Sequence, residues 1–250
     1  MLGFSTPPPK GSTADEPAIP FPVTSRPSSS FSSSLKFEPL VIPNEPGVFA
    51  GVVRHVFSPE ECQQIISHSE TQGTYEAALV NVGGGQQISA LDYRNSSRAI
   101  IDDATASLEI WKRIKDVVDL TAVGGSEDWR PVGLNERLRY LRYDAGQYFK
   151  PHMDGCYECP QTGRRSFVTL QLYLNNGLGV DFTGGATTFI SDELALNDPP
   201  QSMRSKEIFT PCNPEAGMVL VFQHRLYHEG TAVDSGRKYA IRTDVMYEPL

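Results

Sequence analysis

The feature that most constrains the fold is a change of pattern near residue 135, where apolar and polar residues begin to alternate with a period of two. Side chains that alternate in this way lie on opposite faces of a β-strand. Gly, Pro, Asn and Asp separate the runs and favour turns. The runs occupy residues 136–143, 166–175, 184–189, 217–222 and 238–247. Many short strands in succession predict a β-sandwich or jelly roll.

Helical patterns come before these strands. Ser58 is a good N-cap, Pro59 suits the first helical position and Glu61 completes a capping box. The sequence therefore predicts a helix over residues 59–71. A second helix is predicted over residues 103–120 from one apolar stripe with spacings of three and four. The stripe consists of Leu108, Trp111, Ile114 and Val118. We expect a mainly β domain with flanking helices, of the α+β class.

The first 34 residues differ in composition from the rest. Residues 1–34 are rich in Pro, Ser and Thr. Such a segment buries too little apolar surface to offset the entropy of ordering it. We expect a disordered tail there and one folded domain over residues 35–250, a length that is ordinary for a single domain.

Charge and cysteine content narrow the function and the location. The formal net charge of -8 argues against general binding to nucleic acid or to anionic membranes. No stretch approaches the roughly 18 consecutive apolar residues of a membrane span, and the first residues contain no apolar core of signal-peptide length. Four cysteines do not make a disulfide scaffold. These features predict a cytoplasmic protein, and they do not specify an oligomeric state.

The segment with the most chemical information contains His152 and Asp154, two positions apart. In a strand, residues i and i+2 face the same side, so an imidazole and a carboxylate would project into one cavity. Two histidines and one carboxylate leave three metal positions open, which suits non-haem Fe(II) oxygenases. A chance pair with a surface or core histidine would have the same spacing. The block at 219–247 favours the metal site, because a histidine there is followed by a turn and a strand that begins with a cation.

Taken in order, these motifs resemble the prolyl 4-hydroxylase-like branch of the Fe(II)/2-oxoglutarate dioxygenases. The resemblance runs from about residue 47 to the C-terminus. It implies a double-stranded β-helix, which is a distorted jelly roll. The residues that carry it are Tyr143, Gly146, Pro151, His152, Asp154, Gly184, Gly185, Thr187, Phe189, His228 and Lys238.

The resemblance also implies a complete set of metal ligands. It makes His228 the third ligand beside His152 and Asp154, because of its H-E-G context and its spacing to Lys238. His224 is the alternative, four residues earlier and of the same strand parity. If His224 is not a ligand, we expect it to support the site from outside the ligand set.

Further roles follow from the same resemblance. Lys238 resembles the family's anchor for the distal carboxylate of 2-oxoglutarate, and Tyr143 and Tyr173 resemble co-substrate-binding tyrosines. The alternatives are a solvated lysine at a strand end and two tyrosines of the core. Other candidates to line the cavity or its entrance, or to hold an anionic substrate group, are Arg242, Thr187, Arg94 and Arg98. Each of these could instead be a solvated, paired or core residue.

Cys156 and Cys159 form a C-x-x-C pair just after the metal pair. A structural zinc site needs a second pair of ligands, and Cys62 and Cys212 are isolated in the sequence. No thioredoxin-like βαβ pattern surrounds the pair. We expect a loop that flanks the mouth of the site.

The resemblance implies an enzyme that uses Fe(II), 2-oxoglutarate and O2, with ascorbate, to hydroxylate a C–H bond and release succinate and CO2. The expected substrate is a peptidyl residue, for which proline is one candidate, or a small metabolite. Two other classes remain open. One is a non-catalytic jelly-roll module that binds a ligand or a protein. The other is a zinc hydrolase with the same ligand set.

Overall fold

A computed structural model describes residues 20–22, 34–43, 45–83, 86–121, 123, 128–191 and 209–250. Within these residues the helices are α2 (Pro59–Gln72) and α3 (Ala104–Ile114). The strands are β1 (Phe37–Pro39), β2 (Ala50–Val53), β3 (Glu76–Ala77), β4 (Val80–Gly83), β5 (Gln86–Ile88), β6 (Ser97–Asp102), β7 (Trp129–Leu134), β8 (Arg137–Asp144), β9 (Phe149–His152), β10 (Arg165–Tyr173), β11 (Phe182–Gly184), β12 (Thr187–Ile190), β13 (Phe209–Cys212), β14 (Val219–Gln223), β15 (His228–Gly230) and β16 (Val233–Pro249).

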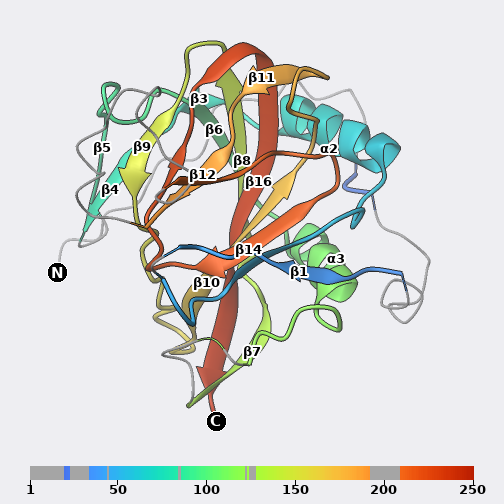
Figure 1. Cartoon of the computed structure of the whole chain (residues 1–250). Coiled ribbons are helices and arrows are strands. Elements are labelled where there is room, and N and C mark those ends of the chain that lie inside the picture. Colours follow the sequence, from blue (N-terminus) through green and yellow to red (C-terminus); the bar gives the residue numbers. More distant parts are fainter. Residues whose placement is uncertain are drawn as a thin grey trace, which may run out of the picture.

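The strands form two principal antiparallel sheets (Figure 1). The larger sheet has the order β1-β2-β14-β10-β16-β8-β6-β3, and β7 and β11 also pair with β16. The smaller sheet has the order β13-β12-β15-β9, and β4 pairs with β5 as a separate hairpin. The chain passes repeatedly from one sheet to the other, which is the topology of the double-stranded β-helix expected from the sequence.

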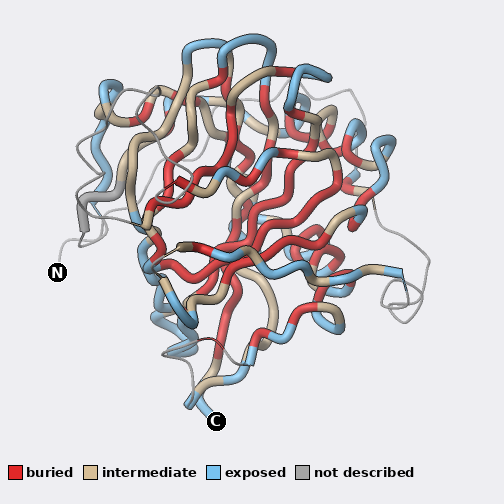
Figure 2. Tube along the Cα trace, viewed as in Figure 1, coloured by how far each residue is buried: buried red, intermediate tan, exposed pale blue. Residues whose placement is uncertain are grey.

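Each face of the larger sheet packs against a different layer. Leu172 of β10 belongs to a core that includes Ile65 of α2 and Ile110 of α3. Tyr173, the next residue, belongs to a second core with Phe189 of the smaller sheet. Figure 2 shows buried chain along the central strands, between the exposed turns. The helices therefore cover one face of the larger sheet, and the smaller sheet covers the other.

The 17-residue strand β16 shows this division along its length. Ile241 and Val245 belong to the core on the helix side, whereas Ala240 belongs to the core between the sheets. Because side chains alternate along a strand, Lys238 and Arg242 lie on the same face as Ala240. Strand β16 thus presents Lys238 and Arg242 to the space between the two sheets.

Helix α2 begins as the sequence predicts. The Ser58 hydroxyl accepts from the backbone N–H of Glu61 at 3.2 Å, and the Glu61 carboxylate accepts from the Ser58 N–H at 2.8 Å. Pro59 occupies the first turn, where its missing N–H costs nothing. In the described chain, neither helix has the length and apolar character needed to cross a membrane.

The prediction for α3 is wrong in its length and partly right in its buried face, because Ile114 and Val118 of the stripe lie in the core and Trp111 packs against it. The helix ends at Ile114, because Val117 and Val118 both donate to the Ile114 carbonyl and form a turn. Leu108, predicted to be buried, is 50% exposed. The buried face carries the charged residues Glu109 and Arg113. The apolar stripe could not indicate that the Glu109–Arg113 ion pair shares this buried face.

Arg113 connects the two helices. Its guanidinium is 2.8 Å from Glu61 of α2 and 2.9 Å from Glu109 of α3, and it lies 3.9 Å above the Phe57 ring. The side chains of Arg113 and Glu109 are 1% and 3% exposed. A buried charge of this kind persists because it is both paired and hydrogen-bonded.

The predicted disordered tail, residues 1–34, lies mostly outside the described residues. Of that segment, residues 20–22 and 34 are described. The Phe21 side chain is buried, with its ring 6.0 Å from Phe57 and 6.4 Å from His68. Phe21 thus joins the core on the helix side, although it precedes residue 35.

We predict that Arg113→Ala lowers the free energy of unfolding by about 3–5 kcal/mol, because it leaves the Glu109 carboxylate buried without its cation. Chemical denaturation measures the change. Lys112→Ala is the matched control on the exposed side of the same helix, and its effect should stay within about 0.5 kcal/mol. Equal effects of the two substitutions would contradict a stabilising role for the buried ion pair.

Candidate metal centre

Two histidines face each other across neighbouring strands of the smaller sheet. His152 is the last residue of β9, and His228 is the first residue of β15. The two are direct partners in the antiparallel pairing, and their ring centroids are 4.3 Å apart. Residues opposite each other in such a pair have side chains on the same face. The register of one strand pair therefore places both imidazoles at one point.

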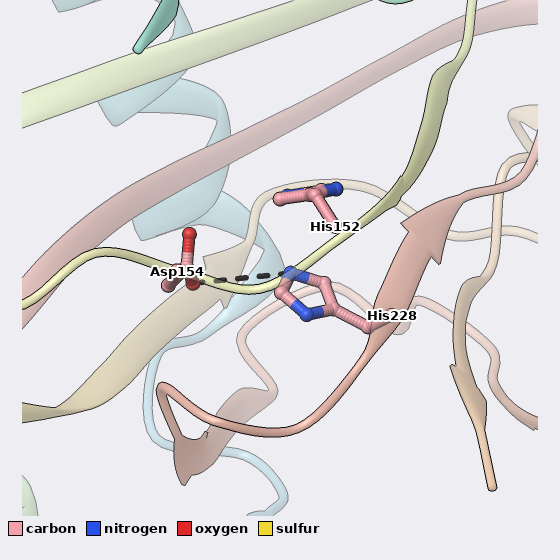
Figure 3. A group of neighbouring side chains, drawn as sticks. All are labelled: His152, Asp154 and His228. Atoms are coloured by element: carbon pink, nitrogen blue, oxygen red, sulfur yellow. Dashed lines mark ion pairs between the residues drawn. The ribbon is translucent and has the colours of Figure 1, made fainter. Parts of the chain in front are cut away.

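Asp154 completes the group from just beyond the strand. The predicted strand through His152 and Asp154 ends at His152, so Asp154 lies in the loop that follows the strand and not in the strand itself. The backbone N–H of Asp154 instead donates to the His224 carbonyl at 3.0 Å. One ligand atom from each of His152, Asp154 and His228 lies within 4.8 Å of the others (Figure 3).

Backbone carbonyls orient both imidazoles. Nδ1 of His152 lies 2.8 Å from the Lys150 carbonyl, and Nδ1 of His228 lies 2.9 Å from the Leu226 carbonyl. A carbonyl oxygen only accepts, so Nδ1 carries the proton in each ring and donates it. Nε2 is then the bare nitrogen, which is the atom that a metal would bind. Phe149 stacks on the His152 ring at 3.6 Å and further restricts it.

The carboxylate of Asp154 is also held from two sides. Its Oδ2 accepts from the Thr169 hydroxyl at 2.5 Å and lies 3.8 Å from Nε2 of His228. Its Oδ1 is 3.0 Å from the Arg242 guanidinium. These partners fix the plane of the carboxylate relative to the two histidines, as partners of ligating groups do in metal sites.

Burial and neighbouring charges set the protonation of the group. Burial lowers the pKa of both histidines, and that of His152 falls well below its usual value. Burial alone would raise the pKa of Asp154, but Arg242 and then the two histidines hold it well below its ordinary value. Arg242 is the first cause of the lowered pKa of Asp154 and therefore favours its ionised form. Two neutral imidazoles and one carboxylate form a donor set suited to Fe(II).

Lys238 lies buried in the same space between the sheets. Its side chain is 2% exposed, and its ammonium donates to the Gly185 carbonyl at 2.6 Å. It lies 5.3 Å from the centre of the Tyr143 ring and 5.4 Å from that of Tyr173. Within the described chain, no carboxylate pairs with it. Burial lowers the pKa of Lys238 to about 8, so the ammonium still predominates at neutral pH.

The two glycines of the GGxTxF motif make the approach to Lys238 possible. Gly184 and Gly185 have φ of +70° and +68°, in the left-handed region that favours glycine. A Cβ at Gly184 would lie 2.2 Å from the Ala232 carbonyl. The turn between β11 and β12 therefore needs glycine, and it aims the Gly185 carbonyl at the lysine.

The remaining polar candidates divide between the two ends of this space. Near Lys238, the Tyr173 hydroxyl donates to the Thr187 hydroxyl at 2.7 Å. Arg242 lies at the other end, where it pairs with Asp154 and, also at 3.0 Å, with Asp244. His224 lies beside Asp244 at 3.4 Å, which places it outside the group of possible ligands.

The two arginines of the 93–98 segment take different positions. Arg94 is buried, with its guanidinium 4.4 Å above the Phe149 ring, so it lies one ring away from His152. Arg98 donates to the side chain of Gln87 on β5 at 2.5 Å. Arg94 therefore lies beside the metal group, whereas the contact of Arg98 is to the β4–β5 hairpin.

The sequence analysis missed several residues of the site. Some of them could have been found, because they lie on the same strand face as a predicted site residue. Thr169 has the parity of Tyr173, Arg139 has that of Tyr143, and Asp244 has that of Lys238. Phe149 carries no comparable signal, because its stacking depends on how β9 meets β15.

The cysteines add no ligand group. Cys156 and Cys159 are free in the loop after Asp154, and in the described chain His152, Asp154 and His228 are the residues that could hold a metal.

We predict that His228→Ala and Asp154→Ala each weaken Mn(II) binding by more than about 100-fold, since even the outer partners of metal ligands contribute about 10–100-fold. Calorimetry measures the affinity. His224→Gln is the matched control, because it keeps the backbone carbonyl that holds Asp154, and it should change the affinity by less than about tenfold. A larger loss in His224→Gln than in His228→Ala would assign the third ligand to His224.

Comparison with known proteins supports the resemblance independently of the site geometry. Residues 138–243 match the model of the 2OG-Fe(II) oxygenase superfamily. None of the curated proteins matches the sequence.

Solved structures share the fold. A prolyl hydroxylase from Trichoplax adhaerens, in complex with a hypoxia inducible factor oxygen degradation domain peptide, aligns with a TM-score of 0.53 and 17% identity over 81% of this chain and 84% of that one. A viral collagen prolyl hydroxylase from Paramecium Bursaria Chlorella virus-1 aligns with a TM-score of 0.48 and 17% identity over 79% of this chain and 94% of that one. A prolyl-4-hydroxylase from Pseudomonas putida has a TM-score of 0.46 and 17% identity, with 78% and 91% covered. The resemblance to prolyl 4-hydroxylase-like dioxygenases is confirmed, with residues 138–243 similar to the 2OG-Fe(II) oxygenase superfamily.

Proposed function

We propose that the protein is an Fe(II)- and 2-oxoglutarate-dependent dioxygenase that hydroxylates a C–H bond of a peptidyl residue or a small metabolite. The observation that carries the proposal is the placement of two features in one space between the sheets. These are the group of His152, Asp154 and His228, and the buried ammonium of Lys238. The first suits Fe(II) and the second suits the distal carboxylate of a dicarboxylic acid.

The roles of the residues follow from this placement. His152, Asp154 and His228 would hold Fe(II). Lys238 would pair with the far carboxylate of 2-oxoglutarate, and Tyr143 and Tyr173 would border that carboxylate. Once bound, Fe(II), 2-oxoglutarate and O2 supply the oxidising chemistry, in which 2-oxoglutarate becomes succinate and CO2 and one oxygen atom enters the substrate. The protein orients the target bond and excludes water, and ascorbate would keep the iron reduced.

A non-catalytic binding module is a weaker explanation for the same residues. Burying a lysine without a paired anion is costly, and burying two neutral imidazoles beside a carboxylate serves no packing purpose. A zinc hydrolase would use the same three ligands, but it has no need of a buried cation for a dicarboxylate.

The two substrate classes have different support. A peptidyl proline is suggested by the solved prolyl hydroxylases, one of which holds a peptide. At 17% identity those structures carry the fold alone, so a small metabolite is supported equally well.

The direct test of the proposal is succinate formation from 2-oxoglutarate by the purified protein with Fe(II), ascorbate and O2. We expect slow turnover by the wild type even without substrate, and none by His152→Ala. Thermal unfolding of both proteins controls for loss of fold. Equal turnover by the two proteins, or no turnover and no 2-oxoglutarate binding by the wild type, would refute the proposal.

A pH dependence is also predicted. The cationic form of Lys238 predominates below about pH 8 and is lost above it. A bound carboxylate would raise this pKa, so the affinity for 2-oxoglutarate should be full below pH 8 and fall by up to about tenfold per pH unit above it. Titration calorimetry between pH 7 and 9 measures the effect. In Lys238→Arg the guanidinium stays charged over this range, so the decline should disappear.

A further inference from the structure

The wall of the site opposite the smaller sheet carries a group of arginines. Arg139 of β8 and Arg242 of β16 are direct partners in the antiparallel pairing. Arg139 shares the face of Tyr143, and Arg242 shares the face of Lys238, so both point into the space between the sheets. Arg98 of β6 lies on the same face, opposite Leu141 of β8. Like charges placed directly opposite each other destabilise a strand pair unless an anion compensates them.

The carboxylates of the described chain compensate this group only in part. Asp244 lies 3.0 Å from Arg242 and 3.3 Å from Arg139. Asp154 lies 3.0 Å from Arg242, but under the proposed function it is also a metal ligand. Arg242 is thus committed to two aspartates, and Arg139 has a share in one of them.

Arg94 lacks a carboxylate partner within the described chain. Its contacts include the Ser96 hydroxyl at 3.2 Å, a hydrogen bond with the Tyr143 hydroxyl, a long contact of 3.5 Å to the Leu79 carbonyl, and the face of the Phe149 ring. The residue is 8% exposed. Leaving a guanidinium buried on an aromatic face without an anion costs free energy. Arg98 is only partly buried: its guanidinium donates to the neutral amide of Gln87, and the charge of Glu76, its partner in the strand pairing, compensates it in part.

Electrostatic effects within the group agree with this arrangement. Burial lowers the pKa of Arg98 to about 10, and the charges of Arg94 and Arg139 add to the shift. Burial also lowers the pKa of Arg139, and repulsion by Arg242 adds to it. Asp244 is also shared with His224, whose Nε2 lies 3.4 Å from its carboxylate. The anions on this wall are therefore fewer than the cationic and polar groups around them.

We propose that Arg139 on this wall and Arg94, which bridges to Phe149 of the smaller sheet, together bind an oxyanion of the substrate. The inference rests on the proposed function and specifies its substrate. Arg94 is one ring away from His152, so an anion held there lies near the metal group. Arg139 retains 22% exposure of its side chain and is open to a ligand. The oxidised carbon therefore lies a few bonds from a carboxylate, phosphate or sulfate group.

The geometry favours an oxyanion over a neutral prolyl side chain. A guanidinium presents paired N–H donors that match the oxygens of a carboxylate or phosphate. A pyrrolidine ring would bury the same guanidinium groups without satisfying them. The substrate is therefore an organic acid, or a residue whose anionic group lies next to the oxidised position.

Two simple anions test the proposal on the full chain loaded with Mn(II) and N-oxalylglycine, an unreactive analogue of 2-oxoglutarate. Sulfate represents a tetrahedral group and acetate a carboxylate, and each is titrated by calorimetry. We expect saturable binding of at least one, weakened at least about tenfold in Arg94→Gln and in Arg139→Gln. Tighter binding of sulfate supports a phosphate or sulfate ester, and tighter binding of acetate supports a carboxylate.

The matched control is Arg142→Gln, which removes a cation from the same strand but from the opposite face. Arg142 pairs with Glu70 of α2 and lies 4.3 Å above the Tyr75 ring. Its substitution should leave anion binding unchanged. Failure of either anion to bind the loaded wild type, or an equal loss in Arg142→Gln, would overturn the oxyanion site and leave the proposed function standing. Failure of Mn(II) and N-oxalylglycine to load would overturn both.

Discussion

The antiparallel pairing of β9 with β15 sets His152 opposite His228, and the other features of the site take their positions from that register. A shift of one residue would turn one imidazole to the other face of the smaller sheet. Asp154 depends on the same pairing, because it follows β9 directly and its backbone is held by the carbonyl of His224. Side chains from two segments distant in sequence thus meet through one strand pair and one hydrogen bond.

The larger sheet contributes the charges around this point. Its strand β16 places apolar residues against the helices and Lys238 and Arg242 against the smaller sheet. The two cations act at different ends of the site. At one end of the site, Arg242 pairs with Asp154 and keeps it ionised. At the other end, Lys238 lies buried without a carboxylate partner in the described chain. One face of a single strand therefore carries both the arginine that supports the metal group and, four residues away, the lysine proposed to bind the co-substrate.

The sequence predicted the parts of this arrangement that depend on short-range patterns. Period-two runs identified the strands, and the capping box identified the start of α2. The group of His152, Asp154 and His228 was expected from the resemblance. The burial of Glu109 and Arg113 on α3 could not be predicted, because an apolar pattern does not reveal a buried ion pair. The opposition of Arg139 and Arg242 was also hidden, since pairing between distant strands depends on register, which no local pattern encodes.

The central claim is that the metal group and Lys238 form one site for Fe(II) and 2-oxoglutarate together. Visible absorption under anaerobic conditions tests this directly, because a charge-transfer band arises when a 2-oxo acid chelates Fe(II). The account predicts a band for the wild type that is absent in His228→Ala. In Lys238→Ala, the same band should require a much higher 2-oxoglutarate concentration. Tight binding of Fe(II) with no band on adding 2-oxoglutarate would contradict the account.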